Sequence, residues 1–582
     1  MLQQLWQQVP GTIRVGLISV IISILYLLPH LIASEGAIYG DDLHFHLDRV
    51  RGLAGIWQSP VNFKSFYRIG QGVNFFYPYL TFLPFYWLYT LSHNLYLAWM
   101  MYLFGLTTLG YGIAYYSAKG MTQNSRTGHF FALFYTFATY RFVNHAIRFA
   151  AGELVATTFL PLVFYGLYLI LKGQSKKWYY LSFGIVLVLY SHLLSFVMMI
   201  GFVIFFFIIG IGFSDHRLKR TRDFILAALS SFIMSSFQLL PMLEQMHLHN
   251  YITPGKFSDT LDAKPFKDLI MLAWSNNVSQ HTFGLMILVA FAISLLFIRK
   301  FKAFDYLLLA LTIVLVIIQT PNLVVKPFEP IQFIWRFNAY ITLFALFLAA
   351  KFLGTSHFKN GKAYLLLLVL LMIGHSSLTL KTYHASRSYP ANPVGELSKR
   401  NDFKTLTNSI ILMDYANPSD DKTRQIYDAD SKVHHRVFDQ ASGDQLQSTV
   451  RFTNTSAKFT ILNPTADTQV IELPLYHYKG QYATVDGIEA PTIVSKRSGS
   501  TLIHLPPGEH RVTVTYHYTT LAKTCFVMAI LTLTLTLYYI LDIHLNVTYR
   551  LLTYFQEKKR KTSQTVVTNQ DATKRWSPQQ ES

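Results

Sequence analysis

The sequence predicts an all-α polytopic membrane protein that carries a small β-sandwich domain before its last helix. Of its 582 residues, 51% are hydrophobic and only 14% are charged, whereas soluble domains carry roughly 25% charged residues. Twelve apolar runs approach the length of about 20 residues that crosses a bilayer, and mean hydropathy is +0.29. One polar stretch near the C-terminus alternates in the manner of β-strands. A mostly soluble enzyme is therefore excluded.

The predicted membrane spans begin with residues 13–34. This run looks like a signal peptide, but its basic start is only Arg14 and many spans follow it, so we interpret it as a retained anchor. The spans after it are 95–117, 127–142, 154–172, 178–195, 197–213, 223–242, 283–298, 304–320, 335–353, 363–380 and 523–542.

A further apolar run at 75–92 contains Pro78 and Pro84 and many aromatic residues, which suit an interface better than a lipid-facing span. The positive-inside rule decides its placement, because five basic loops fall on one side only if 75–92 does not cross. We therefore expect 75–92 to be a re-entrant or interfacial helix on the outer face. The basic loops contain Lys119 and Arg126; Lys172, Lys176 and Lys177; Arg217, Lys219, Arg220 and Arg222; Arg299, Lys300 and Lys302; and Lys351, Lys359 and Lys362.

This topology predicts four parts: a membrane domain over 1–380, an outer β-rich domain over 381–522, a last span at 523–542 and a basic cytoplasmic tail at 543–582. Both termini lie in the cytoplasm, and we expect the tail to be disordered against the inner leaflet. In the outer domain the segments 468–475, 481–487, 501–505 and 510–518 read as strands, with turns at Asp486-Gly487 and Pro506-Pro507-Gly508. A small antiparallel sandwich is the natural interpretation.

The net charge of +19 would suggest nucleic acid as the partner of a soluble protein. Here the Lys and Arg residues are spread through the inner loops, which favours anionic lipid and argues against nucleic-acid binding. The single cysteine, Cys525, excludes intramolecular disulfides and cysteine-based metal clusters.

The sharpest chemical signal follows the first span, where GDDLHFHLDR begins a predicted amphipathic helix over 41–57. Asp41, His44 and Asp48 fall on the side opposite its apolar stripe, and Asp41 and Asp42 would lie at its N-terminus, where a helix favours carboxylates. The helix could present these groups to a pocket, or its acids could simply complete the first turn at the interface. A Mg²⁺ or Mn²⁺ site is also open, since carboxylates and histidine bind such ions. The apolar stripe consists of Leu43, Leu47, Val50, Ala54 and Trp57.

Three more polar clusters are predicted on the same outer face. Each has an alternative: the loop residues could pair with one another, the histidine could pack between helices, and the last arginine could be an interfacial anchor. An arginine at a pocket's lip is suited to bind phosphate. The convergence on one face is what points to a site. The clusters are Arg141, Asn144, His145, Arg148 and Glu153; Ser191 and His192; and Arg336 in the stretch IQFIWRF.

No Gly-rich phosphate loop, Walker lysine or GxSxG elbow is present, so ATP-driven and acyl-hydrolase chemistry lack support. The outer acidic helix, the proline-bearing aromatic segment and the many spans resemble the GT-C class of integral-membrane glycosyltransferases. More narrowly, GDDLHFHLDR, RFAAGEL, Ser191-His192 and IQFIWRF resemble the bacterial membrane family labelled pyruvoyl-tetrahydropterin synthase-related, with Ile334 where that motif has proline. The small soluble pterin enzyme itself has no counterpart here. The stretches LPLYHYKGQYATVDG and LPPGEHRVTVTY resemble ectodomains linked to glycosylation of cell-wall polymers.

The resemblance implies transfer of a sugar from a polyprenyl-phosphate donor to a cell-envelope acceptor, such as a cell-wall or teichoic-type polymer, outside the bacterial cytoplasmic membrane. Carried over, Asp41 best matches the general base, with Asp42 as its neighbour or a metal ligand. Inverting transfer needs a carboxylate to take the acceptor proton and cations to stabilise the leaving phosphate. Arg148 and Arg336 are the expected phosphate ligands. His44, Asp48, Glu153 and His192 are second choices as ligands of Mg²⁺ or Mn²⁺ or as acceptor contacts.

Two other functions remain open at this point. A transporter or flippase of lipid-linked glycans has a similar composition, but transporters show paired helix interruptions that are not found here. An envelope scaffold would use the outer domain to bind wall polymer without catalysis.

Overall fold

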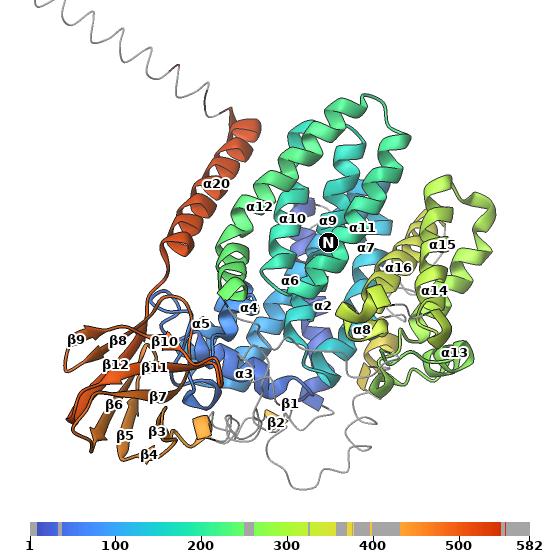
Figure 1. Ribbon diagram of the computed structural model, residues 1–582. Coiled ribbons are helices and arrows are strands. Elements are labelled where there is room, and N and C mark those ends of the chain that lie inside the picture. The colour runs from blue at the N-terminus through green and yellow to red at the C-terminus, as the bar shows by residue number, and fades with distance from the viewer. Residues whose placement is uncertain are drawn as a thin grey trace, which may run out of the picture.

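The computed structural model describes residues 8–32, 38–248, 261–323, 326–356, 369–374, 376–377, 396–397 and 431–546, with residues 548 and 553. A helical bundle forms the body of the protein, a β-sandwich lies at one end of it, and α20 runs back along α12 from the sandwich (Figure 1). The predicted class, a helical protein with a β-sandwich before the last helix, is confirmed.

Seven helices within the described residues are long and apolar enough to cross a membrane. Five more predicted spans are not confirmed in that form. Residues 127–142 divide between α7 and α8, three others contain helices of 11 to 15 residues, and most of 363–380 lies outside the described residues. The long helices are α2 (Gly11–Ile32), α6 (Leu95–Thr122), α9 (Ala151–Leu171), α11 (Leu193–Gly212), α12 (Arg217–Leu248), α16 (Asn338–Thr355, with the preceding turn η9, Ile334–Phe337) and α20 (Thr520–Leu545).

Shorter helices complete the bundle and its outer loops. They are α3 (Leu43–Gly52), α4 (Val73–Phe76), α5 (Leu83–Ser92), α7 (Ser125–Thr136), α8 (Thr139–Phe142), the π-helix η3 (Val143–Ile147), α10 (Tyr179–Leu189), α13 (Phe266–Trp274), α14 (Leu285–Leu296) and α15 (Ala303–Ile317). The run 75–92 therefore contains only short helices, and it is not among the candidate spans. Pro78 and Pro84 each remove a backbone donor, which explains why no long helix forms there.

Small residues allow the long helices to approach closely. A Cβ atom on Gly166 of α9 would collide with the backbone of Leu181 in α10, and one on Gly184 of α10 would meet Val163 in return. Close approach through glycine is a common source of helix packing in lipid, where apolar burial gives little driving force. The α9–α10 pair is accordingly fixed along much of its length.

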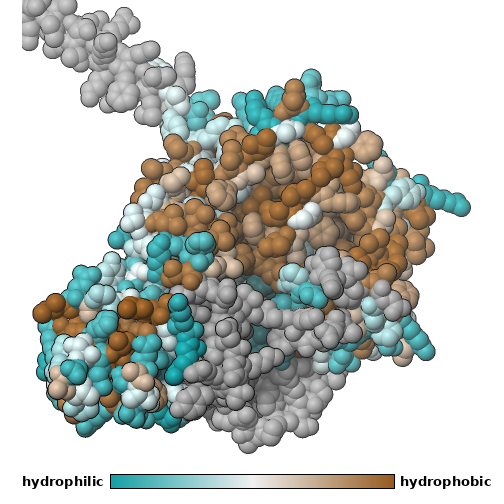
Figure 2. All heavy atoms as spheres, viewed as in Figure 1, coloured by the Kyte–Doolittle hydropathy of each residue, from teal (hydrophilic) through white to brown (hydrophobic). Residues whose placement is uncertain are grey.

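Basic loops gather at the end of the bundle away from the sandwich. There the side-chain amide of Asn124 donates to the carbonyl of Gly354 at 3.3 Å, and Lys351 pairs with buried Asp305 at 2.5 Å. Hydrophilic side chains cover this end, while apolar side chains cover the helices below it (Figure 2). The two polar ends and the apolar belt between them are those of a protein that spans a bilayer.

The C-terminal domain is a sandwich of two five-stranded antiparallel sheets within the described residues, in the orders β10-β11-β7-β3-β4 and β5-β6-β12-β8-β9. The four predicted strands correspond to β7 (Gln469–Tyr476), β8 (Gln481–Val485), β11 (Ser500–Leu505) and β12 (Gly508–Tyr516). Asp486 and Gly487 both take positive φ in the tight turn after β8, as such hairpins require. The sequence did not predict β3 (Val437–Asp439), β4 (Gln445–Leu446), β5 (Ser448–Phe452), β6 (Ser456–Asn463), β9 (Ile488–Ala490) and β10 (Ile493–Val494).

The sandwich shares a core with the loop that follows α3, which the sequence predicts to be an outer loop. Phe63 and Phe75 pack with buried sandwich residues, and backbone bonds join Phe63 to Asn454 at 3.1 Å and Tyr476 to Ile69 at 3.0 Å. Tyr518 also donates to the carbonyl of Ile56 at 2.7 Å. The loop and the sandwich therefore form one packed unit. Most of 381–430 and all but two residues of the predicted tail beyond 546 lie outside the described residues.

Candidate active site

Five short elements meet at the end of the bundle that carries the sandwich. They are the turn before α3, the segment α8–η3, the first turn of α9, the residue before α11, and η9. The π-helix η3 widens the backbone, a feature frequent at functional sites, and Phe149 after it takes a φ of 55°. This irregular stretch brings Arg148 over the start of α9.

Glu153 is the centre of the cluster. It lies in the first turn of α9, where the helix dipole favours a carboxylate, and it is 3% exposed. Its Oε2 accepts from Nη1 of Arg148 at 2.9 Å, and its Oε1 accepts a short hydrogen bond from the Tyr140 hydroxyl. Nε of Arg336 lies 3.8 Å from Oε2. One buried carboxylate thus holds two guanidinium groups side by side.

Arg148 connects this cluster to the turn before α3. Its carbonyl accepts from the backbone N–H of Asp42 at 2.8 Å, and its Nη2 lies 3.7 Å from Oδ2 of Asp42. Nη1 also donates to Asn144 at 3.0 Å, and the guanidinium lies 4.5 Å from the ring centre of Trp335. The N-terminal turn predicted from GDDLHFHLDR is therefore tied by its backbone to the second predicted cluster.

Arg336 enters from η9. Its Nη1 donates to the carbonyl of Ile331 at 2.9 Å and to the side chain of Gln332 at 2.7 Å. Its Nε and the indole Nε1 of Trp335 are buried, and neither has a hydrogen-bond partner within the described residues. Buried donors without partners carry an energetic cost unless a ligand satisfies them. They are the type of donor that an oxygen-rich ligand uses.

The carboxyl group of Asp42 marks the open side of the cluster, because its side chain is 45% exposed whereas those of Glu153 and both arginines are below 10%. Burial among its neighbours raises the pKa of Asp42 above its usual range; Arg148 opposes this rise and the charge of Asp41 adds to it. Asp41 is exposed beside it. Asp42 is thus a carboxylate that binds a proton more readily than usual at the mouth of a site that contains two arginines.

Aromatic side chains form one wall of the site. The ring of Tyr77 lies 5.7 Å from that of His192 and 3.8 Å from the guanidinium of Arg49. A Cβ atom at position 152 would collide with the Tyr77 hydroxyl, so Gly152 allows this ring to lie against the start of α9. His192 caps α11, with Nδ1 2.8 Å from the Ser195 hydroxyl. It is therefore part of the wall.

The structure brings together Asp42, Arg148, Glu153 and Arg336 from three predicted clusters, while Asp48 lies apart. The α3 helix spans only Leu43–Gly52, shorter than the predicted 41–57, and Trp57 at the end of the predicted stripe is 55% exposed. Asp48 is buried and accepts from the backbone N–H of Phe66 at 2.6 Å, which anchors the outer loop. His44 is half-buried on α3.

Tyr140, Tyr77 and Gly152 are contributors that the sequence reasoning missed. Tyr140 directly precedes the predicted cluster in the sequence, and Gly152 directly precedes Glu153. Two other residues of that cluster pack elsewhere: Arg141 donates to Thr158 at 3.1 Å, and His145 bonds Tyr26 and His30 at 2.8 and 2.6 Å. Position in the sequence therefore did not distinguish the residues that contribute to the site from the neighbours that pack elsewhere.

A metal position is not evident in this arrangement. In the described part of the chain, no group of three or more His, Cys, Asp or Glu side chains is placed to hold a metal ion. Both oxygens of Glu153 are already occupied by Tyr140 and Arg148. A role for Mg²⁺ or Mn²⁺ therefore stays a possibility raised by the sequence.

The Asp48 carboxyl makes stability depend on pH. Burial raises its pKa from 3.8 to about 6, although the Phe66 N–H opposes the shift. A carboxyl that is more basic in the folded than in the unfolded state stabilises the fold below pH 3.8, and this contribution is lost as the pH rises through about 6. We expect Asp48→Asn, which keeps an acceptor for Phe66, to remove that dependence. Melting temperatures of both proteins in detergent between pH 4 and 7 measure it; curves that stay parallel would contradict the assignment.

The fold and the site define a membrane protein with several apolar helices and a charged site at one end of its bundle. The family described as bacterial membrane protein YfhO matches residues 67–393, more than half of the sequence, and the chain belongs to that family. No match is found among curated proteins. Among solved structures, the arabinofuranosyltransferase AftD from Mycobacteria, determined by cryo-EM, is similar at 14% identity and a TM-score of 0.45. The similarity covers 87% of this chain and 40% of that one.

Proposed function

We propose that this protein is an integral-membrane glycosyltransferase. It moves a sugar from a polyprenyl-phosphate donor to an extracytoplasmic acceptor, such as a cell-wall or teichoic-type polymer. The observation that supports this proposal is the meeting of Asp42, Arg148, Glu153 and Arg336 at one end of the bundle. This cluster places Asp42, a carboxylate with a raised pKa, beside Arg148, and Glu153 holds Arg148 and Arg336 together.

The site belongs to the outer side of the cytoplasmic membrane in this proposal. The basic loops lie at the opposite end of the bundle, where positive charge marks the cytoplasm. Both termini are then cytoplasmic, and residues 381–522 are outside. The sandwich lies at the same end as the site (Figure 1), where an envelope polymer would arrive.

The two arginines bind the donor phosphate. A guanidinium presents a planar fork of donors that matches phosphate oxygens, and the unpartnered Nε of Arg336 leaves one such donor open. Glu153 is a positioning residue, because it holds both guanidinium groups and offsets their mutual repulsion before the donor binds.

Asp42 acts as the general base. The acceptor hydroxyl oxygen forms a bond to the anomeric carbon while the bond from that carbon to the phosphate oxygen breaks. The hydroxyl proton passes to the Asp42 carboxylate, and the negative charge of the released polyprenyl phosphate is stabilised by Arg148 and Arg336. The sequence favoured Asp41 for this role; contact with Arg148 and the raised pKa favour Asp42, with exposed Asp41 facing the acceptor. No step is assigned to a metal, and turnover measured before and after chelation tests whether Mg²⁺ or Mn²⁺ takes part.

Arg336→Lys is expected to weaken donor binding while preserving charge. An ammonium group cannot reproduce the guanidinium fork, and a hydrogen bond to a charged group is worth about 1.5–3 kcal/mol. KM for the donor should therefore rise by roughly tenfold or more, with a smaller change in kcat. Titration of the donor in liposomes measures both constants, and an unchanged KM would remove Arg336 from the phosphate site.

Purified protein in liposomes tests the function directly. The protein receives labelled polyprenyl-phosphate sugars and envelope polymer, and the release of free polyprenyl phosphate is followed. Release that depends on the acceptor supports a transferase. Movement of the intact donor across the bilayer without release would instead show a transporter of lipid-linked glycans and overturn the proposal.

A further inference from the structure

We propose that an apolar cavity between the helices of the bundle, far from the charged site, holds the distal hydrocarbon chain of the lipid-linked donor. This inference rests on the proposed function and adds to it a second contact region, far from the reacting atoms. The ligand class that fits an apolar lining is a long, flexible, uncharged hydrocarbon.

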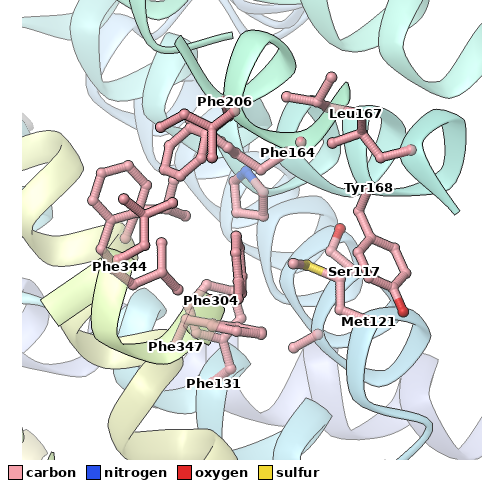
Figure 3. A pocket seen from close by; sticks show the side chains of 18 residues that line it. Ser117, Met121, Phe131, Phe164, Leu167, Tyr168, Phe206, Phe304, Phe344 and Phe347 are labelled. Carbon is pink, nitrogen blue, oxygen red and sulfur yellow. The ribbon is translucent and has the colours of Figure 1, made fainter. Parts of the chain in front are cut away.

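The cavity has a volume of about 120 Å³ and lies between α6, α7, α9, α11, α15 and α16. Phenylalanine rings dominate its lining, and Ser117 and Tyr168 supply its two hydroxyl groups, as Figure 3 shows. An engineered cavity of comparable size and lining stays dry and binds apolar molecules. The rings are those of Phe131, Phe164, Phe206, Phe304, Phe344 and Phe347.

Helices that carry the charged site also line this cavity. Glu153 and Phe164 both belong to α9, and at the α-helical rise their Cα atoms are separated by roughly 16 Å. Arg336 lies in η9, directly before the helix α16 that carries Phe344, and His192 caps the helix α11 that carries Phe206. The ring of Phe344 contacts both Phe164 and Phe206 at centroid distances of 5.5 and 5.6 Å. The cavity therefore lies along the same three helices, below the proposed phosphate site.

The lining indicates entry from the bilayer. Phe304 on α15 is 43% exposed although it lines the cavity, whereas Phe206 across from it on α11 is 5% exposed. The neighbouring side chains Phe205 and Ile208 are exposed on the apolar surface of α11. A chain whose phosphate is bound by Arg148 and Arg336 could thus run within the membrane and enter between α11 and α15. Its distal part would gain contacts that an empty cavity lacks.

Photo-crosslinking of the wild-type protein tests this inference without requiring turnover. The probe is a polyprenyl phosphate with a diazirine near the distal end of its chain, and a phospholipid with a terminal diazirine is the comparison. We expect the polyprenyl probe to label peptides of α11, α15 and α16, with unlabelled polyprenyl phosphate reducing the label. Equal labelling by the phospholipid, or label confined to other helices, would overturn the assignment.

Cavity filling gives a second test. Ala118 lines the cavity and is fully buried, so Ala118→Phe should reduce labelling at least tenfold. It should also slow transfer from long-chain donors while sparing a farnesyl-phosphate donor. Gly105→Phe adds the same side chain to α6 where no other atom lies within 4 Å, and it should change neither. Labelled cavity peptides in a protein without transferase activity would overturn the proposed function but support the hydrocarbon site. Transferase activity without label in the cavity would support the proposed function but overturn the hydrocarbon site.

Discussion

Replacing Glu153 by Gln is expected to destabilise the protein strongly. In the wild type, Arg148 and Arg336 both lie within 4 Å of the same Glu153 oxygen. The variant leaves these two buried guanidinium groups beside a neutral amide in place of that carboxylate. Removing one partner from a buried ion pair costs about 3–5 kcal/mol. We expect a lower melting temperature in detergent and less monodisperse protein.

Glu244→Gln is the matched control for this change. Glu244 is 10% exposed, but its partner Lys479, at 3.0 Å, is 54% exposed and keeps access to water. Pairs with a solvent-exposed cation contribute roughly 0–1 kcal/mol, and Glu244 also accepts from Thr519 at 2.7 Å, which Gln can still do. A melting temperature that falls equally in both variants, or in neither, would contradict the role given to Glu153.

Asp42→Asn is expected to abolish most sugar transfer while leaving the fold intact. General-base catalysis contributes about 10²- to 10⁴-fold, and Asn retains the shape of the side chain but not its basicity. Because the pKa of Asp42 is raised, the acid limb of kcat/KM in the wild type should lie above the usual carboxyl range of about 3.8. Release of polyprenyl phosphate across a pH series measures both effects.

Asp41→Asn provides the comparison at the neighbouring position. Asp41 is exposed and Asp42 contacts Arg148, so we expect the Asp41 variant to retain much more activity. If Asp41→Asn were inactive and Asp42→Asn active, the base would be Asp41. Thermal stability of both proteins separates lost chemistry from lost folding.

Much of the fold followed from apolar runs and alternation. The long helices and the strands β7, β8, β11 and β12 have regular hydrophobic patterns. The run 75–92, which the pattern of basic loops set apart, is not among the candidate spans. The strands that were missed have weaker local signals: β10 has two residues and β3 has three, and their pairing depends on partners distant in sequence. The helices of 11 to 15 residues end before the apolar runs that contain them, and the length of an apolar run does not show where a helix ends.

For the candidate site, the sequence indicated which residues to consider but not how they are arranged. Charged residues in apolar surroundings identified Asp42, Arg148, Glu153 and Arg336, because such groups are costly at membrane depth unless they pair. Helical periodicity placed Asp48 with Asp41, yet α3 begins only at Leu43 and Asp48 instead bonds to the outer loop. Tyr77 and Tyr140 are ordinary aromatic residues in the sequence, and only the tertiary fold places them beside Glu153 and His192.

The core shared by the outer loop and the sandwich has a mechanical consequence. Ile69 bonds to a strand of the sandwich, and Phe75 contacts Tyr478 and Tyr516. Two residues after Phe75, Tyr77 forms part of the aromatic wall of the candidate site. The segment from Ile69 to Tyr77 therefore connects the sandwich to the aromatic wall through packed residues. Under the proposed function, a polymer held by the sandwich would transmit force directly to the aromatic wall, and this packing would fix its distance from the site.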